Sequence, residues 1–168
     1  MVIGHSRLGK TSLWTGARDR RFAIVFVNSS GTGGAAISRR DFGQTVEHIN
    51  TRRPYWFCGN FHKYNKRVND LPVDQHMLFA LIAPRPAYVG MANRDMWADA
   101  HGMIKTVQKA DDFYKFLGLE GLPHKNDPKL NVPVQGTLGY HVRPGSHNIL
   151  EYDWKQYVKF AKKHFDMV

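Results

Sequence analysis

The sequence predicts an α/β fold with a mainly parallel sheet and flanking helices, and three observations predict it. Residues 22–27 form a continuous apolar run, which is typical of a strand buried on both faces of a parallel sheet. Segments of strand character alternate with segments of helical spacing along the chain. The chain also opens with a short apolar segment, a tight turn and a helical segment, in that order.

The expected elements alternate in sequence order. Strands are expected at residues 1–3, 22–27, 87–92 and 138–142, and helices at residues 11–18, 74–82, 105–117 and 150–165. Residues 42–64 are aromatic and polar by turns and indicate short helices in an insertion, whereas residues 118–133 indicate a loop rich in Gly, Pro and Asn. The last helix carries an apolar stripe at helical spacing, formed by Leu150, Trp154, Val158, Ala161 and Phe165.

Composition narrows the classes of function. Lys and Arg total 24 against 14 Asp and Glu, a formal net charge of +10, but the basic residues are scattered and no nucleic-acid-binding motif accompanies them. A solvated basic surface is therefore favoured over a nucleic-acid site, and an acidic substrate remains compatible with the charge. No apolar run approaches the roughly 20 residues that span a bilayer. The single cysteine, Cys58, can form no internal disulfide, and its apolar neighbours indicate a buried, inert thiol.

The turn after the first strand has the features of a nucleophile elbow. Gly4-His5-Ser6 stands where a strand turns sharply into a helix, which would hold the Ser6 hydroxyl above the sheet. The helix N-terminus behind Ser6 would offer backbone N–H groups to a developing oxyanion. Because Leu8 stands where the usual pattern has a second glycine, the motif alone leaves an ordinary capping serine as an equal alternative.

The order of polar residues along the chain strengthens the enzyme interpretation. α/β-Hydrolases place the nucleophile, the acid and the histidine in that order. Asp95 follows the strand at residues 87–92, and His147 lies in a loop before the last helix. We therefore expect Ser6 as nucleophile, His147 as base, and Asp95 as the carboxylate that orients the imidazole.

Alternative roles remain for some of these residues. Asp99 is the nearest competitor for the role of the acid, although it is expected to cap the segment that follows it. Asp95 could instead pair only with Arg94 or another surface cation. His5 is expected to pack in the turn, and His76 to be a core or supporting histidine. No histidine pair has zinc-ligand spacing with cysteine or carboxylate support, so neither a metal nor a cofactor is expected.

The expected architecture is therefore a partial α/β-hydrolase fold that starts at the nucleophile elbow. An initial strand of three residues is shorter than the usual five or six, so further strands are expected upstream. Residues 1–168 are interpreted as the C-terminal part of a single hydrolase domain.

Further motifs extend along nearly the whole chain. They are Gly4-His5-Ser6-Arg7-Leu8-Gly9-Lys10, Asn28-Ser29-Ser30-Gly31, Gly33-Gly34-Ala35-Ala36, Ser38-Arg39-Arg40, Trp56-Phe57, Asn60-Phe61, Asp74-Gln75-His76-Met77, Ala83-Pro84-Arg85-Pro86, Trp97-Ala98-Asp99 and residues 139–147. With them the chain resembles the glucuronoyl esterases of carbohydrate esterase family 15, and most closely their bacterial branch. The Ser-Arg-x-Gly-Lys form of the elbow explains the missing glycine at position 8.

The resemblance implies a serine esterase that cleaves the ester between glucuronic acid of xylan and lignin alcohols through an acyl-enzyme. It implies a carbohydrate partner and a secreted or periplasmic location. By position, Arg7 would stabilise the oxyanion, and Lys10, Gln44 and Trp97 would contact the sugar, Gln44 standing where relatives often have Glu. Without the family, Lys10 would be interpreted as a solvated lysine and Trp97 as a core aromatic.

The chain departs from the family pattern in two respects. Many relatives carry a catalytic glutamate at the position of Ser29, which leaves Asp95 as the candidate acid. The resemblance also implies that the upstream half of the domain is expected outside this sequence. Two rival functions stay open: another carbohydrate esterase, such as an acetyl xylan esterase, and a non-catalytic fragment that only binds carbohydrate. The oligomeric state is not predicted.

Overall fold

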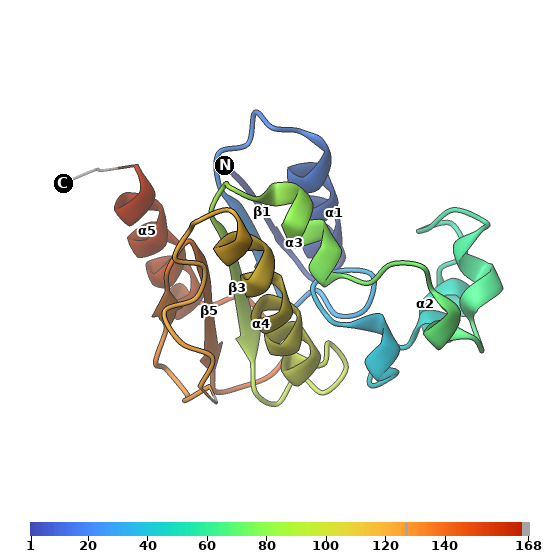
Figure 1. Ribbon diagram of the computed structural model, residues 1–168. Helices are drawn as coiled ribbons and strands as arrows, with labels where there is room; N and C mark the ends of the chain where they lie inside the picture. The colour runs from blue at the N-terminus through green and yellow to red at the C-terminus, as the bar shows by residue number, and fades with distance from the viewer. Residues whose placement is uncertain (127, 166–168) are drawn as a thin grey trace.

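A single sheet forms the centre of the molecule (Figure 1). The computed structural model describes residues 1–126 and 128–165, and in this part of the chain five strands pair in the order β1-β2-β3-β5-β4. The first four are parallel and the short β4 is antiparallel to β5, which confirms the expected mainly parallel sheet. The strands are β1 (Val2–His5), β2 (Val25–Asn28), β3 (Ala87–Ala92), β4 (Val134–Gln135) and β5 (Leu138–Arg143).

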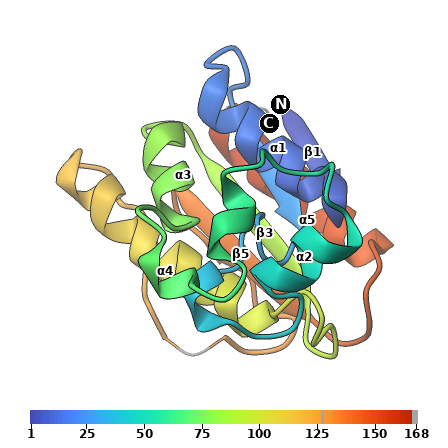
Figure 2. The ribbon, with the colours of Figure 1, turned by 90° about the vertical axis from the view of Figure 1, so that its right-hand side faces the viewer.

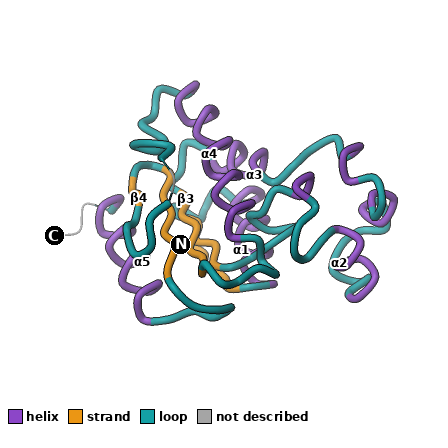
Figure 3. The backbone as a smooth tube through the Cα atoms, turned by 90° about the horizontal axis from the view of Figure 1, so that it is seen from below, coloured by secondary structure: helices purple, strands orange, loops and turns teal. Residues whose placement is uncertain are grey.

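Helices cover both faces of the sheet, and in Figure 3 the strands separate α5 from the others. The longer helices are α1 (Arg7–Arg18), α3 (His76–Ile82), α4 (Ala100–Phe116) and α5 (Glu151–His164). On one face, α1, α3 and α4 pack side by side and bury Leu13, Phe79 and Met103. On the other face, Tyr157 and Phe160 of α5 pack against aromatic residues of β2 and β3.

The segment between β2 and α3 forms a separate lobe, which lies at the right in Figure 1 and is turned toward the viewer in Figure 2. The short helices expected within residues 42–64 are α2 (Val46–Arg52) and η2 (Phe61–Tyr64), and the lobe also contains η1 (Ser38–Arg40) and η3 (Val68–Asp70), which lie outside that range. A small core of Val46, Val68 and Leu71 holds it together. Cys58 lies in this lobe and is exposed, so the prediction of a buried thiol was wrong. The lobe's small core is filled by other side chains, and local apolar neighbours do not by themselves bury a residue.

Several element boundaries differ from the predicted ones for local reasons. β2 begins at Val25, because the Phe22 carbonyl accepts a hydrogen bond from Arg85 Nη1 (2.9 Å) and Ala23 is exposed. α1 begins directly after the turn, at Arg7. α4 begins earlier than expected because the Asp99 carboxylate accepts from Gly102 N (3.0 Å) and caps the helix.

The terminal helix presents a different face to the core from the one predicted. Of the predicted stripe, Ala161 is buried, but Trp154 is 48% and Val158 53% exposed. The buried face instead carries Tyr157 and Phe160, with Asp153, Tyr157, Phe160 and Ala161 as the residues the sheet covers. Both sets have helical spacing, and the large aromatic surface of β2 and β3 decides which one packs.

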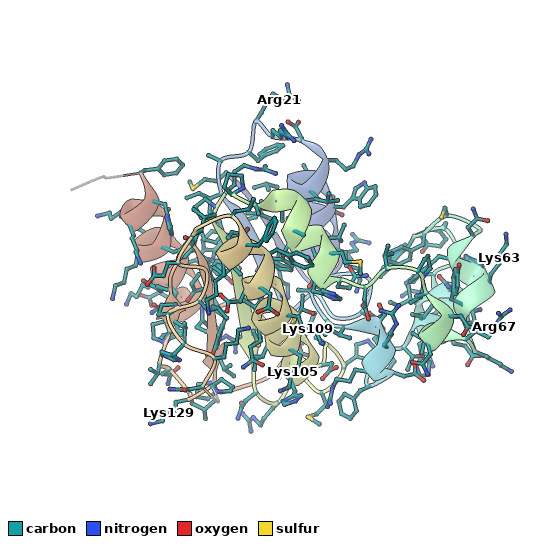
Figure 4. The ribbon with its side chains drawn as sticks, in the orientation of Figure 1. Arg21, Lys63, Arg67, Lys105, Lys109 and Lys129 are labelled. Atoms are coloured by element: carbon teal, nitrogen blue, oxygen red, sulfur yellow. The ribbon has the colours of Figure 1, made fainter. Side chains whose placement is uncertain are left out.

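Charge is distributed over separate surfaces. Figure 4 labels Arg21, Lys63 and Lys129 on well-separated parts of the molecule, with Lys105 and Lys109 on α4. Among the described residues, no helix is long and apolar enough to cross a membrane.

Candidate active site

The expected catalytic residues lie at one edge of the sheet, where the parallel strands end. Ser6 follows β1, Asp95 lies three residues after β3, and His147 lies four residues after β5. Carboxyl ends of parallel strands meet at the same edge, which is where open α/β sheets bind their ligands. The topology therefore gathers side chains that are far apart in the sequence.

Ser6 occupies a sharp turn with strained backbone. Its φ of 58° and ψ of −125° lie in a region that costs a non-glycine residue about 1–3 kcal/mol. The turn is held by the Ser6 N–H, which donates to Asn28 O at 2.8 Å. A Cβ on Gly4 would lie 2.0 Å from the Leu8 carbonyl oxygen, so only glycine lets α1 start so close to β1. These features are those of a nucleophile elbow.

A hydrogen-bonded relay joins the three predicted catalytic residues. The Ser6 hydroxyl donates to His147 Nε2 at 2.8 Å, and His147 Nδ1 donates to Asp95 Oδ2 at 2.6 Å, in the tautomer that carries the proton on Nδ1. Asp95 is 4% exposed, and its Oδ1 accepts from Ala98 N at 3.2 Å. A buried carboxylate that orients an imidazole against a serine hydroxyl is the arrangement that activates a serine nucleophile.

The competing carboxylate has a different partner. Asp99 accepts from Arg40 Nε at 2.9 Å as well as from Gly102 N, so it acts as the helix cap that was predicted. The alternative in which Asp95 pairs only with Arg94 or another surface cation does not hold, because Asp95 contacts His147.

A small pocket opens beside the Ser6 hydroxyl. Its volume is about 200 Å³. It is lined by all four residues to which the family resemblance assigns stabilisation of the oxyanion or contact with the sugar. The lining residues that matter here are Ser6, His147, Arg7, Lys10, Gln44, Trp97, Ser29 and Trp56. Arg7 is exposed at the first position of α1, and Trp97 is 47% exposed, so neither is a core residue.

Lys10 lies at the floor of this pocket with its ammonium group surrounded by oxygen atoms. Its Nζ donates to the Ser30 carbonyl, to Thr32 O at 2.7 Å and to Gln44 Oε1 at 3.1 Å. The residue is 8% exposed, and burial lowers the pKa of Lys10 to about 7. It is therefore not a solvated lysine, and its charge can change near neutral pH.

Ser29 shows why the acid has to come from elsewhere in this chain. It follows β2 with a φ of 43° and is 1% exposed, and its Oγ has no hydrogen-bond partner among the described residues. A serine cannot supply the negative charge that an imidazolium needs.

The other histidines lie outside the relay. His5 Nδ1 bonds to Asn28 Oδ1 at 2.6 Å, and its ring centre lies 4.7 Å from that of His147. Burial lowers the pKa of His5, which favours a neutral ring beside His147. His76 stacks on Phe113 in the α3–α4 interface. Among the described residues, no cluster of His, Cys, Asp and Glu could hold a metal ion.

Sequence reasoning missed the residues that support the relay. Arg143 and Asp153 form a buried ion pair next to the His147 loop, and Asn93 Oδ1 accepts from Gly145 N at 3.1 Å. The only signal in the sequence was a charged residue of each sign within ten residues of His147, because the burial and the contacts of both residues depend on the fold.

Comparison with known proteins places this chain in a family. The family model described as "Glucuronyl esterase, fungi" matches residues 1–118, which is more than half of the chain. The chain belongs to the glucuronoyl esterases, carbohydrate esterase family 15. The α/β-hydrolase fold expected from the sequence is that of its family 15 structural neighbours.

The similar proteins include several of bacterial origin. A carbohydrate esterase from an unknown prokaryotic organism is 55% identical over 163 residues, covering 97% of this chain and 38% of its own. A solved promiscuous family 15 esterase from a marine bacterial metagenome is 55% identical with a TM-score of 0.95, covering 97% of this chain and 41% of its own. A solved glucuronoyl esterase from Solibacter usitatus is 48% identical with a TM-score of 0.92, covering 97% of this chain and 42% of its own.

A more distant relative was solved with a ligand. It is the glucuronoyl esterase of Sporotrichum thermophile in complex with methyl 4-O-methyl-β-D-glucopyranuronate, 26% identical with a TM-score of 0.76, covering 97% of this chain and 42% of its own. The present chain spans about two fifths of the length of these relatives.

Proposed function

We propose that the chain carries the catalytic residues of a serine carboxylesterase that hydrolyses esters of glucuronic acid, such as those that link xylan to lignin alcohols. The observation that carries the proposal is the Asp95–His147–Ser6 relay, with spacings of 2.6 and 2.8 Å, at the mouth of a pocket that contains Lys10. The family supports a carbohydrate ester as substrate, and the relative with a bound methyl glucuronate supports a uronate as its acid part.

In the proposed reaction, Ser6 Oγ attacks the ester carbonyl while His147 Nε2 accepts the hydroxyl proton. Asp95 holds the proton on Nδ1 and stabilises the imidazolium that forms. Arg7 lines the pocket together with Ser6 and is the first residue of α1, so its guanidinium and the helix N-terminus would stabilise the negative charge that develops on the carbonyl oxygen.

The intermediate then breaks down in two stages. The C–O bond to the alcohol breaks as His147 returns the proton to the leaving oxygen, which leaves the uronoyl group on Ser6. Water, deprotonated by the same imidazole, attacks the acyl carbon. The bond from that carbon to Ser6 Oγ then breaks as His147 returns the proton to Oγ, which releases the uronic acid and restores the Ser6 hydroxyl.

The sugar would lie over Lys10, Gln44 and Trp97. The Gln44 amide N–H groups can hydrogen-bond to sugar hydroxyls, and Lys10 can do so by exchanging its 3.1 Å bond to Gln44 Oε1. The half-exposed indole of Trp97 offers an apolar face beside the ring.

A substrate panel tests the proposal. Benzyl glucuronate should be hydrolysed, whereas an acetylated xylose should be hydrolysed much more slowly, because acetate leaves the sugar-contacting residues of the acyl side unused. A fluorophosphonate should label Ser6, as located by mass spectrometry. Preference for the acetylated sugar would indicate an acetyl xylan esterase. The absence of both turnover and labelling would indicate a non-catalytic carbohydrate-binding chain.

A further inference from the structure

The loop that carries His147 is exposed, yet it must hold the imidazole within hydrogen-bond distance of Ser6. Residues 144–148 have no regular secondary structure, and His147 itself is 41% exposed at its side chain. Packing against a hydrophobic core therefore does not fix the position of this loop. Hydrogen bonds to the backbone of the loop have to fix it instead.

Beneath the loop lies the buried guanidinium of Arg143, the last residue of β5. Its Nη1 donates to Pro144 O at 3.1 Å, and its Nη2 donates to Ser146 O at 3.4 Å and to the Asn148 carbonyl. These three carbonyls lie before and after His147. One side chain, 3% exposed, thus binds the loop on both sides of His147.

Asp153, in the first turn of α5, compensates the charge of Arg143. Its Oδ2 accepts from Arg143 Nε and from Leu150 N, each at 2.7 Å, and its Oδ1 accepts from His141 Nε2 at 2.8 Å and Asn28 Nδ2 at 3.1 Å. Burial alone would raise the pKa of Asp153, but these hydrogen bonds lower it, so the carboxylate is ionised. The carboxylate therefore joins the loop, the start of α5 and β2.

The sheet leaves space for this group of polar side chains. A Cβ on Gly90, at the centre of β3, would lie 2.1 Å from the Tyr157 hydroxyl and 2.9 Å from both Asn28 Nδ2 and His141 Cε1. Asn28 in turn accepts from His5, whose ring lies against His147. Asp153 is thus connected to the His147 imidazole by two routes, one through Asn28 and His5 and the other through Arg143 and the loop.

A buried ion pair often adds no more to the free energy of unfolding than apolar side chains in the same place would. Replacing such a pair by apolar residues is often neutral or stabilising, because desolvation offsets the attraction between the charges. A guanidinium does have one property that an apolar residue and a lysine lack. It presents five donors in a rigid plane, which lets it bind a carboxylate and several carbonyls at once.

We propose that the Arg143–Asp153 pair is a positioning device for the esterase reaction: it fixes the loop of residues 144–148 so that His147 lies between Ser6 and Asp95. The inference rests on the proposed function for the role of His147, and it adds two residues that act through that histidine. A displacement of about 1 Å at a catalytic group can cost on the order of 10²-fold in rate.

The test replaces Arg143 by lysine and compares it with the same change at Arg85. Arg85 lies at the other end of the sheet and also binds backbone carbonyls, of Gly16 at 2.6 Å, Phe22 at 2.9 Å and Ile82 at 3.1 Å. We expect Arg143→Lys to lower kcat by about 10- to 100-fold with KM within about twofold. Arg85→Lys should lower Tm to a similar extent and leave kcat within about twofold.

A second readout does not need turnover. The proton between His147 Nδ1 and Asp95 should give a low-field NMR signal that broadens or disappears in Arg143→Lys and persists in Arg85→Lys. If the wild-type chain hydrolyses no ester but this pattern is seen, the proposed function fails and the positioning role stands. If the signal and kcat survive Arg143→Lys, or if both variants lose kcat in proportion to Tm, the positioning role is overturned.

A double variant covers the case in which Arg143→Lys does not fold. Arg143→Met combined with Asp153→Asn removes both charges and leaves no unpaired one, so the sheet and α5 should remain folded by circular dichroism. The three loop carbonyls still lose their donor, and we expect the same loss of the low-field signal. A folded double variant with the wild-type signal would contradict the proposal.

Discussion

Ser6 combines the strained backbone of the elbow with the hydrogen bond to His147, and both point to a nucleophile. We expect Ser6→Ala to lower kcat by several orders of magnitude, because members of a catalytic triad act as a unit. Ester hydrolysis and circular dichroism measure the effect, with Ser146→Ala, an exposed serine beside His147, as control. Full activity in Ser6→Ala would refute the assignment.

The two carboxylates after β3 differ in their partners, and this difference predicts different effects on rate. Asp95→Asn should preserve the fold and lower kcat by about 10⁴-fold, since an amide holds the imidazole in the wrong tautomer. Asp99→Asn should cost far less, because asparagine is also a good helix cap. Measured kcat and Tm for both variants decide the matter, and the reverse order of effects would make Asp99 the acid.

The buried Lys10 predicts a pH dependence of ligand binding. Its pKa of about 7 means that the ammonium form dominates at pH 6 and the neutral form at pH 8. If only the cation binds glucuronate, whose carboxylate stays ionised, the affinity should fall by about tenfold over that range. Calorimetric titration of the wild type and Lys10→Met at both pH values measures this, and the variant reveals the contribution of other titrating groups. An equal fall in both proteins would exclude Lys10 as the cause.

At the scale of elements, the contact between β1 and α1 sets the position of the nucleophile. Gly4→Ala places a methyl group 2.0 Å from the Leu8 carbonyl oxygen, so the first turn of α1 has to move. Such overpacking costs about 1–3 kcal/mol, and each kcal/mol lowers Tm by about 2–4 °C in a chain of this size.

The matched control for this change is Gly59→Ala, where the new methyl group meets no atom within 4 Å. Thermal unfolding should separate the two variants, and Gly4→Ala should also lose activity, since Ser6 moves with the helix. Equal Tm values would show that the elbow tolerates a side chain at position 4.

On the scale of the whole molecule, apolar surface remains uncovered at several places. Ile3 lies on the edge strand β1 and Met1 directly before it, Leu8 and Trp14 are 58% and 57% exposed on α1, and α5 exposes Trp154 and Val158 beside a surface hollow. Exposed patches and open sheet edges favour association. We therefore expect this chain to self-associate or aggregate at micromolar concentration.

Sedimentation measurements and dye binding to apolar surface check this expectation. Replacing both Trp154 and Val158 by lysine should reduce association, because it places charge in the middle of the exposed α5 surface. A wild-type chain that stays monomeric over a wide concentration range, with a cooperative melt and no dye binding, would contradict the prediction.

Much of the candidate site could be predicted because its signals are local or depend on chain order. The strand at residues 87–92 has the predicted limits, and a carboxylate after it and a histidine after the next parallel strand must meet at one edge of the sheet. The structure brings Ser6, Asp95 and His147 together, and their catalytic roles stay a prediction that the variants above test.

By itself, then, the sequence determined the family, the alternation of strands and helices, and the order in which the polar residues follow the strands. Only the tertiary structure decided which face of α5 is buried, that Cys58 is exposed, and that Arg143 and Asp153 support the loop of His147. The physical reason is that periodicity and turn chemistry act over a few residues, whereas burial and charge pairing depend on what another segment presents. Two apolar stripes on one helix are equivalent until an aromatic sheet face packs against one of them.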